Sequence, residues 1–295
     1  MERTNVEKCE LYLGKYNLIG EKAPFSFKLD RQHDKAYIVK YTPDDCDKRT
    51  IEIPSFASYK YDSMNKMFKG TEQSLKVINH SDITDMTHFF SGFAGEELDL
   101  SDFDASKVTD MHGMFSDCDF WHVILDNFDT SNVTDMESMF EGCREIKELD
   151  LSSFDTSRVT NMACMFNSCS DLCKVNLSSF DTSSVTNMEY MFANCGDLNR
   201  LDLSNFDTRE VIDMSEMFSN AGLLEIDLSS FKTPNLLYMY NMFHECYEIR
   251  KINMENFDTS SIEDKYTNLG VFSWCNKLDK LVSKDSIILR EYGNA

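Results

Sequence analysis

The sequence has few of the residues that make tight turns, and it has no long hydrophobic run. Only 4 prolines and 11 glycines occur in 295 residues, so polar side chains must shape many of the corners. No stretch approaches the roughly 18 consecutive apolar residues that a membrane-spanning helix needs, and we expect no membrane insertion. The first 20 residues also lack the basic and then apolar pattern of an export signal, which predicts a cytoplasmic chain as encoded.

Basic residues are scarce as well. The chain has 29 Lys and Arg against 51 Asp and Glu, a formal net charge of -22. Such a surface repels nucleic-acid phosphates and anionic lipid, so neither is an expected partner. The ten cysteines contain no C-x-x-C pair and are too sparse for a small disulfide scaffold.

Enzyme signatures are also missing. The sequence contains no G-x-S-x-G, P-loop, H-E-x-x-H or Rossmann motif, and its six histidines are scattered. We therefore expect neither catalysis nor a cofactor, and no metal.

What the chain does contain is an internal repeat. A Phe-Asp-Thr anchor recurs every 25 or 26 residues, at Phe103, Phe128, Phe154, Phe180, Phe206, Phe231 and Phe257. A second anchor, Met-x-x-Met-Phe, keeps the same phase from Met111 to Phe243. Weaker copies stand at Met64–Phe68, Met86–Phe90 and around Leu269–Phe272.

Within each copy, the spacing of the hydrophobic residues is strand-like in one part and helix-like in the other. Leu149 and Leu151 alternate with polar residues, which is typical of a strand with one buried face. Met136, Met139, Phe140 and Cys143 then follow helical spacing, and T-x-x-E segments such as Thr134 to Glu137 resemble a capping box. The pattern predicts an α/β repeat: a right-handed leucine-rich-repeat-like solenoid of about nine coils, each with one short parallel strand and one short helix.

The open ends of a stacked sheet need covers. We predict an N-terminal β-rich cap over residues 1–60, a solenoid over 61–280 and a C-terminal cap over 281–295. The strand-like segments Ala36–Tyr41 and Thr50–Ile53 belong to the first cap, and Ser286–Arg290 to the last.

The copies LDLSSFDTSRVTNMACMFNSCSDL and LSSFDTSSVTNMEYMFANCGDL resemble the 26-residue repeat of BspA-like leucine-rich-repeat proteins, which is widespread in bacterial surface lipoproteins and adhesins. The resemblance covers about residues 60–280. It implies a leucine-rich-repeat-like fold and a role in adhesion or partner recognition, with no shared catalytic residues. It also points to the cell surface, in contrast to the missing signal, lipobox cysteine and wall anchor.

One outward-facing residue per strand forms the main candidate site. Stacked strands should align these residues, which we call the polar strip: Asp99, Ile124, Asp150, Asn176, Asp202, Asp227 and Asn253. Phe120, Trp121 and His122, just before Ile124, interrupt the consensus and are candidate anchors. We expect a monomer that binds a protein or glycan partner through this surface; the alternatives are an intracellular effector or scaffold, or a solvated face without a ligand.

Two regular features have structural explanations. The corner aspartates, such as Asp155, could line a calcium ladder, but turn-capping hydrogen bonds explain them better without a glycine-rich loop. The Met-x-x-Met-Phe stripe is expected to be core. Six cysteines share one register and are expected to be buried free thiols: Cys118, Cys143, Cys169, Cys195, Cys246 and Cys275.

Overall fold

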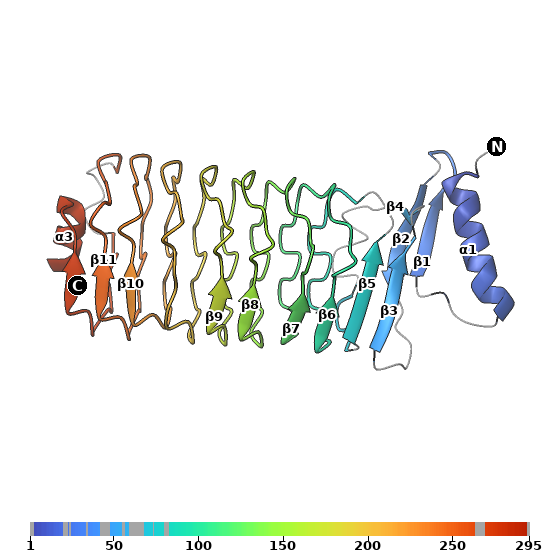
Figure 1. Cartoon of the computed structure of the whole chain (residues 1–295), viewed down its shortest axis with the longest axis horizontal. Coiled ribbons are helices and arrows are strands. Elements are labelled where there is room, and N and C mark those ends of the chain that lie inside the picture. The colour runs from blue at the N-terminus through green and yellow to red at the C-terminus, as the bar shows by residue number, and fades with distance from the viewer. Residues whose placement is uncertain are drawn as a thin grey trace.

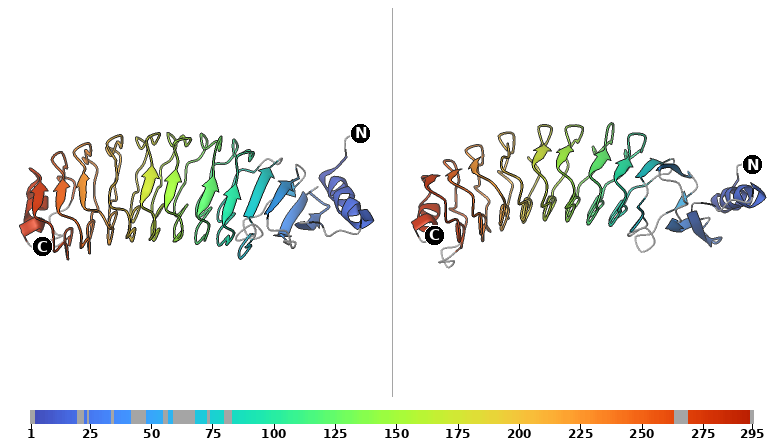
Figure 2. Two further views of the ribbon diagram at one scale, coloured as in Figure 1. Left: turned by 60° about the horizontal axis from the view of Figure 1, so that its bottom comes forward. Right: turned by 90° about the horizontal axis from the view of Figure 1, so that it is seen from below.

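The chain folds into an elongated solenoid. A computed structural model describes residues 3–19, 23, 25–33, 35–41, 48–54, 57–58, 68–72, 74–79, 83–262 and 269–293. The coils stack into a rod with helix α1 (Asn5–Ile19) at one end and α3 (Ser286–Gly293) at the other (Figure 1). Figure 2 shows that the rod bends into a shallow arch. Among the described residues, no helix is long and apolar enough to cross a membrane.

The N-terminal end combines α1 with a small sheet in the order β1-β2-β4 (Phe25–Asp30, Lys35–Tyr41 and Ala57–Ser58). Strands β1 and β2 are antiparallel. Strand β3 (Lys48–Ile53) instead pairs in parallel with β5 (Ser74–Asn79), so the solenoid sheet begins inside the segment expected to be a cap. The predicted boundaries of the two caps stay predictions.

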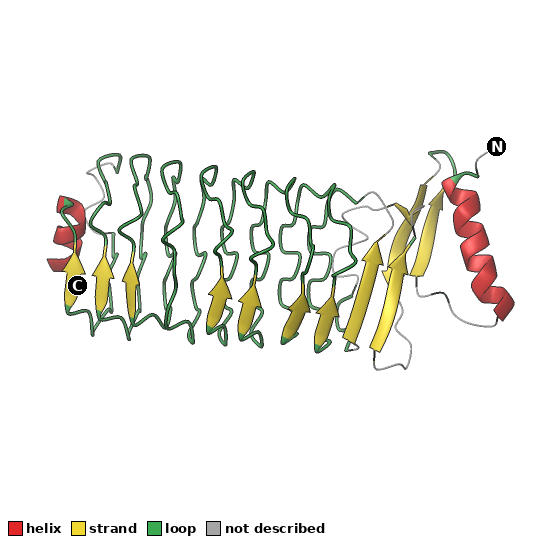
Figure 3. Cartoon of the chain, in the orientation of Figure 1, coloured by secondary structure: helices red, strands yellow, loops and turns green. Residues whose placement is uncertain are grey.

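The remaining strands are three residues long and parallel where they pair (Figure 3). They are β6 (Glu97–Asp99), β7 (His122–Ile124), β8 (Glu148–Asp150), β9 (Lys174–Asn176), β10 (Glu225–Asp227), β11 (Lys251–Asn253) and β12 (Lys280–Val282). Together with β3 and β5, these strands form three sheets: β3-β5-β6-β7, β8-β9 and β10-β11-β12. Over the described residues the solenoid has about eight turns, where we expected about nine coils. Of the weak copy Met64–Phe68, only the buried Phe68 lies within the described residues.

Phenylalanine stacks fill the core. Phe140, Phe166 and Phe192 lie ring over ring in successive coils, with centroids 5.9 Å and then 5.3 Å apart. The anchor phenylalanines form a second column, in which Phe206 and Phe231 stack at 6.4 Å. The predicted inward strand positions are confirmed: most are buried, and Val123, Val175 and Leu201 are partly buried against the same core.

The predicted helix in each coil is wrong. Between residues 83 and 262 the Met-x-x-Met-Phe segments are consecutive turns. Ser138 N donates to Ala163 O of the next coil, and Phe140 N to Met165 O, whereas Met139 N closes a local turn onto Met136 O. Alternate N–H groups thus point along the rod, and an α-helix would direct them all along the segment instead.

Left-handed backbone makes this alternation possible. Each turn segment has two residues of positive φ four positions apart, such as Ser138 and Gly142 in one coil and Cys164 and Ser168 in the next. The spacing i, i+3, i+4, i+7 therefore predicted the buried side chains correctly but not the backbone.

The expected capping box is also absent from these turns. Thr134 Oγ1 donates to Thr109 O of the preceding coil, and Glu137 N donates to Asp135 Oδ1. Asp135, rather than the threonine, therefore starts the segment with a side-chain turn.

The corner aspartates make the hydrogen bonds expected of them. Asp155 Oδ1 accepts from Ser157 N at 3.0 Å, and the equivalent bonds recur in other coils. The threonine of the anchor is buried and bridges coils: Thr156 Oγ1 donates to Asp181 O and accepts from Asp181 N, both at 2.9 Å. Polar side chains thus shape corners that glycine or proline forms in other proteins.

Candidate functional site

The structure places the polar strip on the strand side but divides it into three groups. Registered strands put Asp99 beside Ile124, Asp150 beside Asn176, and Asp227 beside Asn253. Asp202 lies between β9 and β10, in a segment that is not a strand, and is exposed. The strip is therefore continuous only within each of the three sheets.

Asparagines join the strip's aspartates in two of these groups. Asn176 Nδ2 donates to Asp150 Oδ1 at 2.9 Å, and Asn253 Nδ2 donates to Asp227 Oδ1 at 3.0 Å. Each amide replaces what would be a second carboxylate on the neighbouring rung, so like-charge repulsion is avoided.

The carboxylates of the strip stay ionised at neutral pH. The backbone N–H of Ser152 donates to Asp150 Oδ1 at 3.0 Å and holds the pKa of that carboxyl below its usual value. The backbone N–H of Ser204 lowers the pKa of Asp202 in the same way, and the side chain and then the backbone N–H of Ser229 lower the pKa of Asp227. The strip is therefore anionic apart from local cations such as Lys76, whose Nζ lies 3.4 Å from Asp99 Oδ2.

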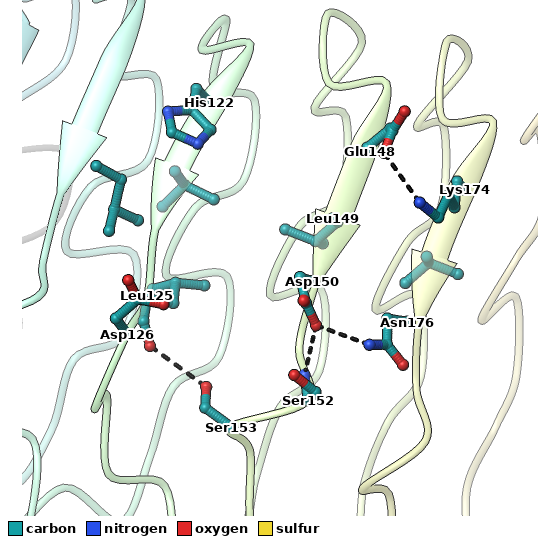
Figure 4. A pocket seen from close by; sticks show the side chains of 13 residues that line it. His122, Leu125, Asp126, Glu148, Leu149, Asp150, Ser152, Ser153, Lys174 and Asn176 are labelled. Atoms are coloured by element: carbon teal, nitrogen blue, oxygen red, sulfur yellow. Dashed lines mark hydrogen bonds and ion pairs between the residues drawn. The ribbon is translucent and has the colours of Figure 1, made fainter.

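A groove of about 720 Å³ opens on the strand side between β7 and the pair β8-β9 (Figure 4). We call it the strand groove. Its polar lining includes His122, Asp126, Glu148, Asp150 and Lys174. Lys174 Nζ lies 3.2 Å from Glu148 Oε2, so one of the carboxylates is partly neutralised. Its floor is apolar and consists of Val123, Leu125, Leu149 and Val175.

The groove coincides with an interruption of the sheet. Strands β7 and β8 belong to different sheets, and no backbone hydrogen bond between these two described strands is present. Ser153 Oγ still connects the two coils, donating to Leu125 O at 3.3 Å, as Ser179 Oγ donates to Leu151 O beside the paired strands β8 and β9. The facing edges of β7 and β8 therefore offer backbone donors and acceptors beside the polar lining.

The irregular segment before β7 divides between core and surface. Phe120 is buried and packs edge-on against Phe115, with ring centroids 5.9 Å apart. Trp121 is 61% exposed, and the exposed His122 has its Nδ1 3.5 Å from Glu97 Oε2. Trp121 and His122 are thus accessible on the surface, and His122 lines the groove, whereas Phe120 is part of the core.

The opening between β7 and β8 was not predicted. The spacing of the anchors does not mark it. Val123 follows Phe115 by eight positions and Leu149 follows Phe140 by nine, but the same change occurs between Phe218–Ile226 and Phe243–Ile252, where β10 and β11 pair. Lys174, Asp126 and Ser153 line the groove from positions outside the predicted strip.

These observations define a repeat solenoid with an interrupted, polar strand face. Its sequence matches the family described as "Mycoplasma protein of unknown function, DUF285" over residues 62–172, 118–201 and 170–284. The chain belongs to this family, because the matches together cover most of its length.

Two solved structures are similar in repeat architecture. A leucine-rich repeat protein from Bacteroides ovatus ATCC 8483 shares 14% identity over 88% of this chain and 75% of its own, with a TM-score of 0.38. A leucine-rich cell surface protein from Faecalibacterium prausnitzii A2-165 shares 14% over 90% and 94%, with a TM-score of 0.31. No curated protein matches the sequence.

Proposed function

We propose that this chain is a non-catalytic binding module that holds a protein partner on its strand face, with the contact centred on the strand groove. The observation that carries the proposal is the interruption between β7 and β8, which leaves two strand edges facing a groove with a mixed polar and apolar lining. A β-strand edge binds an extended segment of another protein through backbone hydrogen bonds.

The charges favour a basic partner segment. Asp126, Glu148 and Asp150 line the groove against Lys174 and His122, and the chain as a whole carries a formal charge of -22. Complementary charge speeds association and selects among partners more than it adds affinity. The BspA-like resemblance of the repeats supports an adhesive role of this kind.

A protein partner fits the groove better than a glycan does. A sugar would use the polar lining, and its hydroxyls can bond single backbone groups, but it does not match the regular spacing of donors and acceptors along a strand edge as a peptide does. A peptide can satisfy both, and its alternate side chains can reach the apolar floor.

Site-specific photocrosslinking in the native host tests the proposal. A photoreactive residue replaces Trp121, the exposed neighbour of the groove residue His122, and in the control it replaces Trp274, which is 62% exposed in the last coils. We expect one defined protein crosslinked at position 121 and absent at position 274. The crosslinked protein is then purified, and its affinity is measured with wild type and with the double variant Glu148→Lys, Asp150→Lys.

We expect the double variant to bind at least about tenfold more weakly, since like charges would then oppose a basic segment. Asp258→Lys, at an exposed corner outside the groove, is the matched control and should bind normally. Equal affinity of wild type and double variant would exclude the groove. A partner that loses binding after periodate treatment but not after proteolysis would replace the protein partner with a glycan.

A further inference from the structure

A second cluster of chemically active side chains lies on the turn segments of two successive coils, away from the strands. His112 stands in one coil, and Asp135 and Glu137 stand in the next. One ligand atom from each of these three residues lies within 4.8 Å of the other two, a grouping that no other residues show in the described part of the chain. All three side chains are half-buried.

The spacing of the donors suits a small cation. His112 Nδ1 and Glu137 Oε2 are 4.0 Å apart. Two ligands of one zinc ion, each about 2.0–2.2 Å from the metal, lie roughly 3–4 Å from each other. Small side-chain rotations therefore bring the imidazole and both carboxylates onto a common ion without backbone movement.

Surrounding hydrogen bonds hold the two carboxylates in place. Asn161 Nδ2 donates to Glu137 Oε2 at 2.7 Å and to Asp135 Oδ2 at 3.3 Å. Asp135 Oδ1 also accepts from Glu137 N at 2.8 Å. Outer contacts of this kind orient metal ligands and are part of known metal sites.

A second imidazole lies beside the cluster. The rings of His88 and His112 are 5.0 Å apart and nearly perpendicular. His88 occupies space that exists only because residue 113 is glycine, since a Cβ there would lie 2.2 Å from His88 Nδ1. The same imidazole borders a pocket of about 400 Å³ that His112 also lines, so the cluster is open to solvent on its His112 side.

The local charge also favours a cation. Among the described residues, neither Asp135 nor Glu137 forms an ion pair with a lysine or arginine, and His112 is the one basic group facing Glu137. Negative charge continues along the next coils, where burial, Asp213, Glu216 and Glu137 raise the pKa of Glu189.

We propose that His112, Asp135 and Glu137 bind a divalent first-row transition-metal ion, with Zn²⁺ as the reference ion. An imidazole with two carboxylates suits zinc, cobalt or nickel, whereas calcium requires six to eight oxygen ligands. Three protein ligands leave at least one coordination position for water or a ligand in the adjoining pocket. This site is independent of the strand groove.

Isothermal titration of the full, EDTA-treated chain with Zn²⁺ tests the site. We expect one saturable event that weakens at least about tenfold in His112→Gln and in Glu137→Gln, because each removes one of three ligands. His122→Gln is the matched control: His122 also faces a carboxylate, Glu97 at 3.5 Å, but belongs to no group of three ligands among the described residues. Its affinity should equal that of wild type.

Cobalt separates this site from binding by cysteine thiolates. Co²⁺ bound by the imidazole and carboxylates gives visible d–d bands without a thiolate charge-transfer band, and His112→Gln should abolish these bands. Circular dichroism verifies that each variant is folded. No saturable Zn²⁺ binding, equal binding by His112→Gln, a thiolate band in wild type, or loss of binding in His122→Gln would each overturn the proposal.

Discussion

Cysteine thiols link neighbouring coils inside the core. Each thiol of the shared register is free, buried and directed at the carbonyl of a phenylalanine in the preceding coil, as in Cys143 Sγ to Phe115 O at 3.0 Å and Cys195 Sγ to Phe166 O at 3.1 Å. The prediction of buried free thiols is confirmed. The S–H donor thus satisfies a main-chain acceptor inside the buried core.

These thiols make the fold sensitive to alkaline pH. Burial raises the pKa of Cys195 from 9.0 to about 12. Because the fold favours the protonated thiol, the contribution of Cys195 to the free energy of unfolding is complete below pH 9.0 and is lost as pH rises toward about 12. At most about 1.4 kcal/mol per pH unit is lost through this residue.

We expect the free energy of unfolding of Cys195→Ala to decrease less between about pH 9 and about pH 11 than that of wild type. Alanine fits this register, since Ala221 is buried at the equivalent position. The measurement is the free energy of unfolding in urea against pH. Cys173→Ala is the control, because Cys173 is exposed, and its pH dependence should equal that of wild type. An unchanged slope in Cys195→Ala would contradict the explanation.

At the scale of elements, the turn segments depend on left-handed backbone. Gly142 has φ of 72°, and a Cβ there would lie 2.6 Å from Asp117 Oδ1. Residues other than glycine fill the same position in other coils, among them Ser168 with φ of 62°. The segment thus tolerates side chains where the neighbouring coil leaves room.

We expect Gly142→Ala to destabilise the fold by about 1–2 kcal/mol, from the left-handed φ and the contact with Asp117. Ser168→Gly, the matched change in the opposite direction, should alter stability by less than about 0.5 kcal/mol, because glycine adopts this φ without strain. Chemical denaturation of both variants provides the measurement. Equal small effects would mean that the turn relaxes around the new methyl group.

These turns also show how much the sequence could predict. The spacing of Met136, Met139, Phe140 and Cys143 identified four buried side chains correctly, because hydrophobic periodicity reports burial. It could not distinguish a helix from turns whose N–H groups donate to the next coil, since that choice depends on stacking. Likewise, alternation around Asp150 predicted an outward side chain, but the opening between β7 and β8 depends on how two coils meet.

At the scale of the whole molecule, each coil contacts mainly its neighbours. Most hydrogen bonds between coils connect residues 24 to 29 positions apart, such as Thr130 with Asp155 and Thr156 with Asp181. Stability in such an architecture is close to a sum of coil terms and interface terms between adjacent coils. A coil can therefore be removed if the contacts of its two neighbours match.

We predict that deletion of residues 155–180, one full repeat, leaves a folded and shorter solenoid. The deletion joins Phe154 to Asp181, so Thr130 acquires Asp181 in place of Asp155, and Phe128 keeps Phe154 beside it. Far-ultraviolet circular dichroism per residue should stay unchanged, and the melting temperature should fall only by a few degrees because one interface is lost.

A deletion of residues 155–167, about half a repeat, is the control for phase. This deletion joins Phe154 to Ser168, so residues from the end of a turn segment stand where the corner is required. The side chains that follow no longer match the inward and outward positions of the neighbouring coils. The coils beyond the deletion therefore cannot stack. We expect this variant to lose cooperative melting although it removes fewer residues. If the full-repeat deletion unfolds to the same extent, stability is not carried by neighbouring coils, and long-range contacts with the terminal elements must hold the rod together.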